Sequence, residues 1–582
     1  MVHAGSYQES VIITNDVRIR SIGGSGATHW EGDGQSVVTI TDGANVQVIG
    51  FTLAPNSGGS LTEIVGVSLP DAARAVLVDV ATVELDDIVV SRFNSTLDGV
   101  ALYAVASTVT VTSSRFESIE TSGEAPGVYS MWSTIDIDYS LFTDLGGSAI
   151  YGRESNINVR GSVFTGNGQI LRGDGGSIHL AGGYLVVADS RFSDGRADNG
   201  GDIWLAPNTL SELAYNSYIG GEAESGGSVF VEQSLLTIQG GRWESNQSEE
   251  EGGAVTQVGR GDATVTDAVF VSNSSGDGGA WYMDSDGSSR PALSVYGTLW
   301  LNNTATTGGG IGSSHTEVLT VSDSIFVGNQ AADGGATRVD VHTSILIENS
   351  LFCSNKATRH GGAFYLDSTD EVGTVRGSVF ALNTANANGG AFWITDTAFD
   401  GDQNTFVDNF SLAEGHAVYS EGIDFTLRRS IVSWTRTLNT EQIYGEGFST
   451  VISEQNLWWP SLDDGYGGDI RPPGSASGDV EGDPGLTGYS SDGDCSGNTW
   501  FPAAGSLAMA SSPELGATGF ETRAWADRDG DGVHAPWDCD DLDPLVAPGQ
   551  PERCNGLDDD CNGLRDDVDG TNPEAVALYF DA

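Results

Sequence analysis

The stretch Phe380-Ala381-Leu382-Asn383, followed after five intervening residues by Gly389-Gly390-Ala391-Phe392, contains the pattern that decides the fold. The pattern is an aromatic residue, two variable residues, an asparagine and then a glycine pair. It recurs about every 26 residues, a period typical of repeat proteins. A unit of this length holds two or three short strands that cannot bury their own apolar face, so successive units must stack. The repeat is marked by the aromatic residues Phe116, Phe142, Phe164, Phe192, Tyr218, Trp243, Phe270, Trp300, Phe326, Phe352, Phe380 and Phe406.

The asparagines and glycines of the repeat are expected at the corners of such a stack. Stacked asparagines can form a hydrogen-bonded ladder, and glycine permits corners with positive φ. We therefore assign both to the scaffold. From Trp243 onward the asparagine is present in every repeat, as Asn246, Asn273, Asn303, Asn329, Asn355, Asn383 and Asn409. The pairs are Gly252-Gly253, Gly278-Gly279, Gly308-Gly309, Gly334-Gly335, Gly361-Gly362 and Gly389-Gly390, and the last repeat has Gly415-His416.

Short apolar runs lie between these markers, such as Ser324-Ile325-Phe326-Val327 and Ala363-Phe364-Tyr365-Leu366. Such β-rich runs predict strands, and no stretch has a capped period of 3.6 that would predict a helix. The less regular N-terminal third has similar runs at residues 11–13, 17–19, 37–40 and 46–51. The sequence therefore predicts an all-β protein built as a parallel β-helix solenoid.

The expected domain boundaries follow from the same pattern. We predict the β-helix over residues 1–520, most regular at 110–420 and ending in irregular coils at 461–520. An Asp-rich module is expected at 521–570. Residues 571–582 resemble the start of a second module copy, because Tyr579-Phe580-Asp581-Ala582 aligns with Trp525-Ala526-Asp527-Arg528.

The repeat at Phe380–Phe392 resembles that of bacterial polymorphic outer-membrane proteins. The opening, from His3-Ala4-Gly5 to Val11, resembles the first coil of pectin-lyase-like β-helices. The second resemblance implies that the helix is right-handed. In such relatives a cap and an export signal precede the matching segment, so we expect the chain to be truncated at its start. The resemblance at residues 571–582 gives the same expectation for its end.

The charge excludes several partners. The chain has 81 acidic and 25 basic residues, a formal net charge of −56, and Lys356 is its only lysine. Nucleic acid needs a basic face, and an anionic membrane surface would repel this chain. No apolar run approaches the length of a transmembrane segment. We expect a secreted or cell-surface, outer-membrane-associated protein whose partners are divalent cations and, in addition, a surface polysaccharide or protein ligand.

Two candidate calcium loops lie in the Asp-rich module. Carboxylates at positions 1, 3 and 5, a glycine at 6 and a carbonyl at 7 are the ligand pattern of a calcium loop. In the first loop Asp538 stands where the closing residue is usually Glu. Hard oxygen ligands favour calcium over zinc or copper. The predicted metal ligands are Asp527, Asp529, Asp531, Val533 and Asp538 in the first loop, and Asp558, Asp560, Asn562, Leu564, Asp566 and Asp569 in the second.

The module also resembles the MopE-like metal-binding motif of bacterial surface proteins. The resemblance is carried by Asp538-Cys539-Asp540-Asp541, Pro548-Gly549, Glu552-Arg553-Cys554-Asn555-Gly556 and Asp558-Asp559-Asp560-Cys561-Asn562-Gly563. The family name associates it with copper, whereas the residues favour calcium.

Five cysteines leave the disulfide pairing open. Cys554 and Cys561 are close enough in sequence to close a small loop, and Cys539 can pair with Cys495 or stay free. Cys353 lies inside a repeat, where we expect a packed thiol.

Three functions remain open. The first is a non-enzymatic, adhesive or structural surface protein with a calcium-binding tail. The second is a polysaccharide lyase or glycoside hydrolase on a β-helix scaffold. Its candidate catalytic residues are Asp86-Asp87, Asp463-Asp464, Arg359-His360 and Gly415-His416. The third is a surface protein that scavenges metal. A line of stacked acids on one face inside a groove would favour the enzyme, and a smooth face without a groove would favour adhesion or spacing. No catalytic residue is assigned.

Overall fold

The structure is a computed structural model of the whole chain. It describes residues 1–486 with gaps, together with Cys495 and residues 545–547, 550, 551, 553 and 559. The gaps are residues 33–35, 56–73, 92, 96, 122–124, 170–172, 286–289, 341–343, 368–371, 423, 435–440, 448–449, 460–465 and 469–477.

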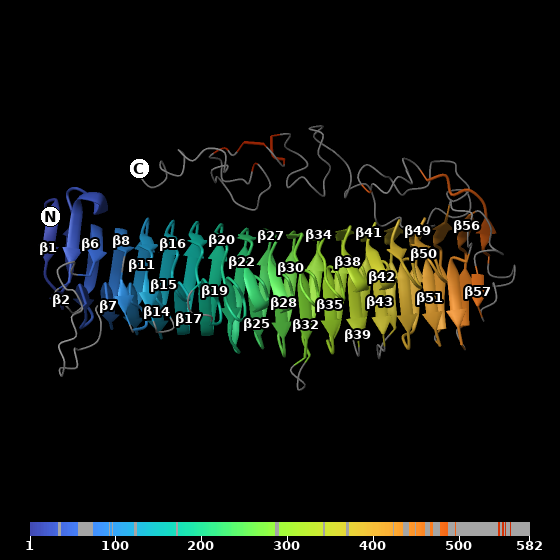
Figure 1. The fold of residues 1–582 in the computed structure, drawn as a ribbon, viewed down its shortest axis with the longest axis horizontal. Helices are drawn as coiled ribbons and strands as arrows, with labels where there is room; N and C mark the ends of the chain where they lie inside the picture. Colours follow the sequence, from blue (N-terminus) through green and yellow to red (C-terminus); the bar gives the residue numbers. More distant parts are fainter. Residues whose placement is uncertain are drawn as a thin grey trace. The chain divides into compact units, whose positions relative to one another are not determined.

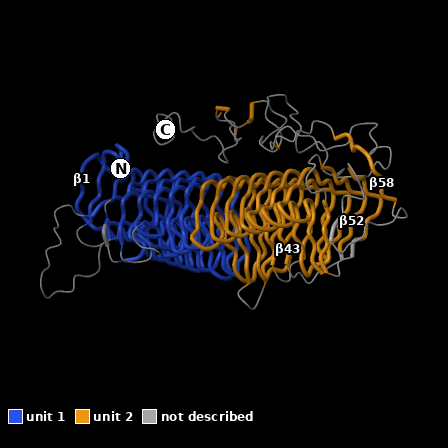
Figure 2. The backbone as a smooth tube through the Cα atoms, turned by 45° about the vertical axis from the view of Figure 1, so that its right-hand side comes forward, with its two compact units in different colours: residues 1–237, 563–582 blue, residues 238–562 orange. Residues whose placement is uncertain are grey.

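The chain forms two compact units, residues 1–237 with 563–582 and residues 238–562 (Figure 2). Each described unit is a β-solenoid with parallel strand ladders, and together they have about 16 turns. In the described residues the only helical segment is the 3-10 turn η1 (Ser25–Ala27). The prediction of a stacked, parallel, all-β solenoid is confirmed.

Unit 1 has three ladders, and its long strands run through two of them. The first contains β2 (Val11–Ile13), β5 (Val38–Ile40), β7 (Val76–Asp79), β10 (Leu102–Val105), β14 (Val128–Met131), β17 (Ile150–Arg160), β19 (Ile178–Ala188), β21 (Ile203–Leu205) and β25 (Val229–Glu232). The second adds β3 (Val17–Arg20), β6 (Asn45–Ala54), β8 (Thr82–Ser91), β11 (Thr108–Thr112), β15 (Thr134–Asp138) and β22 (Thr209–Ala214). The third adds β1 (Gly5–Gln8), β4 (Thr28–Glu31), β12 (Arg115–Glu117), β16 (Leu141–Thr143), β18 (Val163–Thr165), β20 (Arg191–Ser193) and β23 (Ser217–Ile219).

Unit 2 repeats this order, and Figure 1 shows its strands following one another turn by turn. Its first ladder is β29 (Val255–Val258), β32 (Trp281–Asp284), β35 (Ile311–Ser314), β39 (Thr337–Asp340), β43 (Phe364–Asp367), β47 (Phe392–Thr395), β51 (Val418–Glu421), β54 (Ile443–Glu446) and β57 (Tyr466–Gly468). Its second is β30 (Asp262–Thr266), β33 (Ala292–Tyr296), β36 (Val318–Ser322), β40 (Ser344–Glu348), β44 (Gly373–Arg376), β48 (Phe399–Asp402), β52 (Asp424–Arg428) and β55 (Thr450–Glu454).

The third ladder of unit 2 is β27 (Arg242–Glu244), β31 (Val269–Val271), β34 (Leu299–Leu301), β37 (Ile325–Val327), β41 (Leu351–Cys353), β45 (Val379–Ala381), β49 (Thr405–Val407), β53 (Ile431–Ser433), β56 (Leu457–Trp459) and β58 (Val480–Glu481). A short fourth ladder is β38 (Gln330–Asp333), β42 (Lys356–His360), β46 (Thr384–Ala385) and β50 (Phe410–Ser411). The remaining corner strands are β9 (Asn94–Ser95), β13 (Glu120–Thr121), β24 (Glu222–Ser225) and β28 (Gln247–Glu251), whereas β26 (Leu235–Gln239) belongs to the second ladder, where it pairs with β22 and β30.

The repeat aromatics form an interior column in each unit. In unit 2 the rings of Phe270 and Trp300 stack with centroids 4.4 Å apart, and those of Phe352 and Phe380 with centroids 5.1 Å apart. In unit 1 the rings of Phe116 and Phe142 stack at 4.6 Å. Because the period of a strand is two, the central aromatic of each third-ladder strand points inward and its two neighbours point outward.

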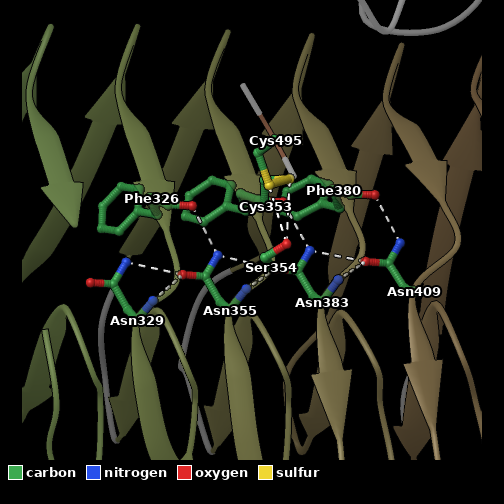
Figure 3. Close-up of a disulfide and its surroundings, with 10 residues drawn as sticks. Phe326, Asn329, Cys353, Ser354, Asn355, Phe380, Asn383, Asn409 and Cys495 are labelled. Carbon is green, nitrogen blue, oxygen red and sulfur yellow. Dashed lines mark hydrogen bonds between the residues drawn. A yellow bond between two sulfur atoms is a disulfide. The ribbon is translucent and has the colours of Figure 1, made fainter. Parts of the chain in front are cut away.

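The asparagine ladder also forms as predicted. The Asn355 amide nitrogen donates to Oδ1 of Asn383 at 3.0 Å and to the carbonyl of Phe326 at 2.9 Å. Its own Oδ1 accepts from the backbone and side-chain nitrogens of Asn329, each at 3.0 Å (Figure 3). The same bonds recur from Asn246 to Asn409, so each buried amide satisfies backbone groups of a neighbouring turn.

The two glycines of each pair are required for different reasons. The first has positive φ, as in Gly361 at 65°. The second has an ordinary φ, but a Cβ on Gly362 would lie 2.0 Å from the carbonyl oxygen of Gly390 in the next turn. The sequence predicted the corner and missed this close approach between stacked backbones.

One cysteine prediction is wrong. Cys353 forms a disulfide with Cys495, 142 residues later, with Cα atoms 6.2 Å apart. The sequence predicts a packed thiol at Cys353 and leaves Cys539 to pair with Cys495 or stay free. The outward position of Cys353 at the end of β41 explains the bond, because it faces the returning chain rather than the interior. Cys539, Cys554 and Cys561 lie outside the described residues.

Candidate functional site

The predicted calcium ligands all lie outside the described residues. They are Asp527, Asp529, Asp531, Val533, Asp538, Asp558, Asp560, Asn562, Leu564, Asp566 and Asp569. Their assignment to a metal site stays a prediction. Among the residues that the structure does describe, no three His, Cys, Asp or Glu side chains come together in a way that could hold a metal.

The described part of the C-terminal module is organised around Asp559. Its carboxylate is fully buried, pairs with the guanidinium of Arg553 and accepts the Arg553 backbone N–H at 2.8 Å. The Arg553 guanidinium also donates to the carbonyl of Leu545 at 3.1 Å, and Ala547 N–H donates to the Asp559 carbonyl at 2.9 Å. The Asp559 carboxylate therefore has a structural role in the described part of the module.

The acids weighed for catalysis in the N-terminal unit have structural partners. Asp87, at a corner with φ of 51°, accepts from the backbone N–H and the hydroxyl of Ser25, at 3.1 and 2.6 Å. Asp86 accepts from the hydroxyl of Thr112 at 3.0 Å. The second acidic pair weighed, Asp463-Asp464, lies outside the described residues.

The histidines weighed for catalysis are also held by the scaffold. His416 is buried, and its Nδ1 accepts from the backbone N–H of Ser411 at 3.0 Å. Arg359 forms an ion pair with Asp333, whose carboxylate also accepts the backbone N–H of His360 at 3.3 Å. Burial lowers the pKa of His360, with Asp333 opposing that shift. Gly415 is a positive-φ corner.

A polar row that the sequence did not predict crosses unit 2. We define it as the outward second and fourth residues of β32, β39 and β43, together with the acids that precede three of the glycine-pair positions. Its members are Tyr282, Asp284, Arg338, Asp340, Tyr365, Asp367, Glu251, Asp277 and Asp333. Asp340 and Asp367 are direct register partners, so two carboxylates stack on adjacent turns.

Arg338 lies within this row. Its Nε donates to Oδ1 of Asp340 at 3.1 Å, and its guanidinium carbon lies 5.2 Å from the centroid of the Tyr365 ring. Tyr365 in turn stacks on Trp393 with centroids 4.3 Å apart. The row therefore combines carboxylates, phenols and one guanidinium on a rigid ladder.

Burial, followed by the charges of neighbouring acids, raises the pKa values of several groups in this row. The pKa of Glu251 rises to about 7, mainly through burial and then through the negative charges of Asp284 and Asp277. Burial also raises the pKa of Asp340, against the opposing effect of Arg338. The pKa of Tyr365 rises to about 12, through burial and then through the charge of Asp367. Glu251 is thus a carboxyl group that titrates near neutrality.

The sequence does contain a pattern that corresponds to this polar row. The residue before the glycine pair is acidic in Glu251, Asp277 and Asp333, and the fourth residue of the following strand is acidic in Asp284, Asp340 and Asp367. Both positions are defined by the repeat. Only the strand register shows that they lie on the same outward face.

The comparisons with known proteins match one segment of the C-terminal module. Residues 538–567 match the family model for the copper-binding MopE type, described as a putative metal-binding motif. No curated protein matches the chain. In the part of the chain that the structure describes, no helix is long and apolar enough to cross a membrane.

Solved structures with a similar β-helix include PL6 family alginate lyases. A mutant form of AlyGC has 10% sequence identity and a TM-score of 0.22, covering 82% of this chain and 96% of its own. AlyGC itself has 10% identity, a TM-score of 0.19 and coverages of 82% and 95%. A mannuronic acid specific family 6 lyase from human gut microbiota has 9% identity, a TM-score of 0.18 and coverages of 82% and 88%.

Proposed function

We propose that this chain is a non-enzymatic, secreted or cell-surface protein with an adhesive or structural solenoid and a metal-binding C-terminal module. The match of residues 538–567 to a metal-binding motif carries the proposal. The buried Asp559–Arg553 pair supports it, because it gives the motif a fixed centre around which flanking acids can be arranged.

Export is supported by the disulfide between Cys353 and Cys495, since disulfides persist in oxidising compartments. The net charge of −56 suits a protein that stays soluble in surroundings rich in divalent cations. We further propose a right-handed, pectin-lyase-like helix with repeats of the polymorphic outer-membrane type. The parallel ladders and the asparagine column at the predicted positions support this assignment.

Calcium is the metal that the sequence of the module favours. Its candidate ligands are carboxylate, amide and carbonyl oxygens, which suit a hard cation. The copper association comes from the family name alone.

Titration calorimetry of the full chain tests the proposal. Calcium should bind with a Kd at or below about 1 mM, within the range of extracellular calcium modules. The double variant Asp527→Asn/Asp558→Asn removes one carboxylate from each loop and should weaken binding at least about tenfold, because each loop loses a charged ligand. The matched control Asp86→Asn/Asp136→Asn, on the solenoid, should leave it unchanged. Absence of heat with both calcium and copper would overturn the proposal, and copper binding alone would favour the metal-scavenging alternative.

A polysaccharide lyase or glycoside hydrolase is the second candidate, favoured by the stacked acids beside Arg338 and Tyr365. Two features place it second. A pKa of about 12 makes the Tyr365 phenolate scarce near neutral pH, and the surrounding carboxylates repel a polyuronate. Incubation with polyuronates and neutral glycans tests it: reducing ends or unsaturated products that disappear in Tyr365→Phe would establish the enzyme.

A further inference from the structure

The third ladder of unit 2 has an apolar outer face, which is unusual for a strand position that points away from the core. We call it the apolar stripe. It consists of Val269, Leu299, Leu301, Ile325, Val327, Leu351, Cys353, Val379, Ala381 and Val407. These residues flank the inward aromatics of β31, β34, β37, β41, β45 and β49. A soluble solenoid has no reason to line an outer face with apolar side chains unless something covers it.

The stripe has a sharp boundary within unit 2. The strand before it, β27, has Arg242 and Glu244 at the same two outward positions, and they pair with each other at 2.9 Å. The register of β27 with β31 places Arg242 beside Val269. The chemistry of the outer face therefore changes from charged to apolar between one turn and the next.

The chain's own return covers one end of the stripe. After β58 the chain reaches the stripe at Leu486, and at Cys495 it is bonded to Cys353. Cys353, Leu351 and Val379 are fully buried there. From β58 back to β41 is five ladder steps, or about 24 Å at the spacing of neighbouring strands, which the 14 residues from Glu481 to Cys495 can easily span. The chain thus runs back along the stripe toward earlier turns.

The stripe beyond the disulfide is less covered. Val327, Leu301 and Val269 are only partly buried, although they continue the same face over three more strands. Three strand spacings are about 14 Å. The next 25 residues of the chain, 496–520, have a single charged residue, Glu514, and include Trp500, Phe501, Leu507 and Met509. The acids resume at residues 521 and 527, at the start of the predicted Asp-rich module.

We infer that the apolar stripe is the docking face for residues 496–520 of this same chain, with the Cys353–Cys495 disulfide as its anchor. Three observations favour this occupant. The disulfide fixes Cys495 on the stripe, Cys495 lies at an earlier turn than β58, and residues 496–520 have a single charged residue over a length that exceeds the remaining three strand spacings. A second copy of the protein or another apolar partner is a competing occupant. The inference is independent of which metal the module binds.

Hydrogen exchange of the full chain, measured by mass spectrometry on peptides covering residues 496–520, tests the inference. The variant Leu301→Asp places a charge on the stripe, where it must be solvated. Thr165→Asp is the matched control, at the third position of β18, whose outer face is not apolar throughout. We expect exchange of the 496–520 peptides to accelerate at least tenfold in Leu301→Asp and not in Thr165→Asp, with far-ultraviolet circular dichroism unchanged in both.

Two further measurements keep the test decisive. Reduction of the wild-type disulfide should accelerate exchange of the same peptides, and it needs no variant that could misfold. A chain ended after Cys495 should bind an apolar dye that the full chain does not bind. Wild-type peptides that exchange as fast as a free peptide would overturn the inference. Dimers in light scattering whose contact is lost in Leu301→Asp would also overturn it, by assigning the stripe to a second copy.

Discussion

The buried Asp202 should make the free energy of unfolding of unit 1 decrease as the pH rises. It lies at the third position of Gly200-Gly201-Asp202, where most repeats of unit 2 have alanine, and it points into the solenoid before β21. The side chain is fully buried, and its Oδ2 accepts from the hydroxyl of Ser228 at 2.9 Å. Burial raises the pKa of Asp202 to about 7, against the lowering effect of Ser228 and with a further rise from Asp194.

The sign and size of the effect follow from that pKa. Between the unfolded pKa of 3.8 and the folded pKa of about 7, the native state holds a proton that the unfolded chain has lost. The contribution of Asp202 to the free energy of unfolding is therefore highest below about pH 4, falls as the pH rises through this window and is constant above it. A difference of about three pKa units corresponds to about 4 kcal/mol in the free energy of unfolding.

Replacing Asp202 by alanine should remove this dependence. The variant loses the hydrogen bond from Ser228, worth about 1 kcal/mol, and no longer buries a charge at high pH. We expect Asp202→Ala to be more stable than wild type by about 2–3 kcal/mol near pH 8 and slightly less stable near pH 4. Urea unfolding followed by circular dichroism at both pH values measures this, with the partly exposed Asp198→Ala as the control. A variant equally destabilised at both pH values would refute the reasoning.

Three other substitutions test the scaffold and the module. Asn355→Ala removes four buried hydrogen bonds and should lower the free energy of unfolding by about 4 kcal/mol, measured by urea titration. Gly362→Ala places a Cβ against the carbonyl oxygen of Gly390 and should cost about 2 kcal/mol in the same assay, because that oxygen belongs to the backbone of the stacked turn and cannot easily move aside. Arg553→Met removes the guanidinium that neutralises the buried Asp559 carboxylate; we expect about 3–5 kcal/mol of local destabilisation, seen as faster hydrogen exchange of residues 545–559.

Controls for these substitutions are present in the chain. Asn156→Ala, at an exposed strand position, and Gly26→Ala, where a Cβ would meet nothing within 4 Å, should each change the unfolding free energy by less than about 0.5 kcal/mol. Arg191→Met, at an exposed strand position, is the control for Arg553→Met. If a ladder or glycine variant behaved like its control, the stacked packing would not have the stabilising role assigned to it.

The repeat pattern was enough to predict the solenoid, because each unit of the pattern is short and its aromatic residue recurs twelve times along the chain. Phe352 and the glycine pair Gly361-Gly362 each pack against the adjacent turn. The residues that they contact there are of the same type and lie one period away in the sequence. The prediction for Asn355 succeeded for the same reason. Stacking converts a sequence period directly into contacts.

The tertiary structure decided what the period does not encode. The polar row needs the register that places Asp340 beside Asp367, and the disulfide joins residues 142 positions apart. Asp202 looks like any turn acid in the sequence, and only its burial makes it a titrating group. These features depend on which side chains lie on the same face of the solenoid or point into its interior. The closed path of each turn sets these directions, and spacing along the chain does not.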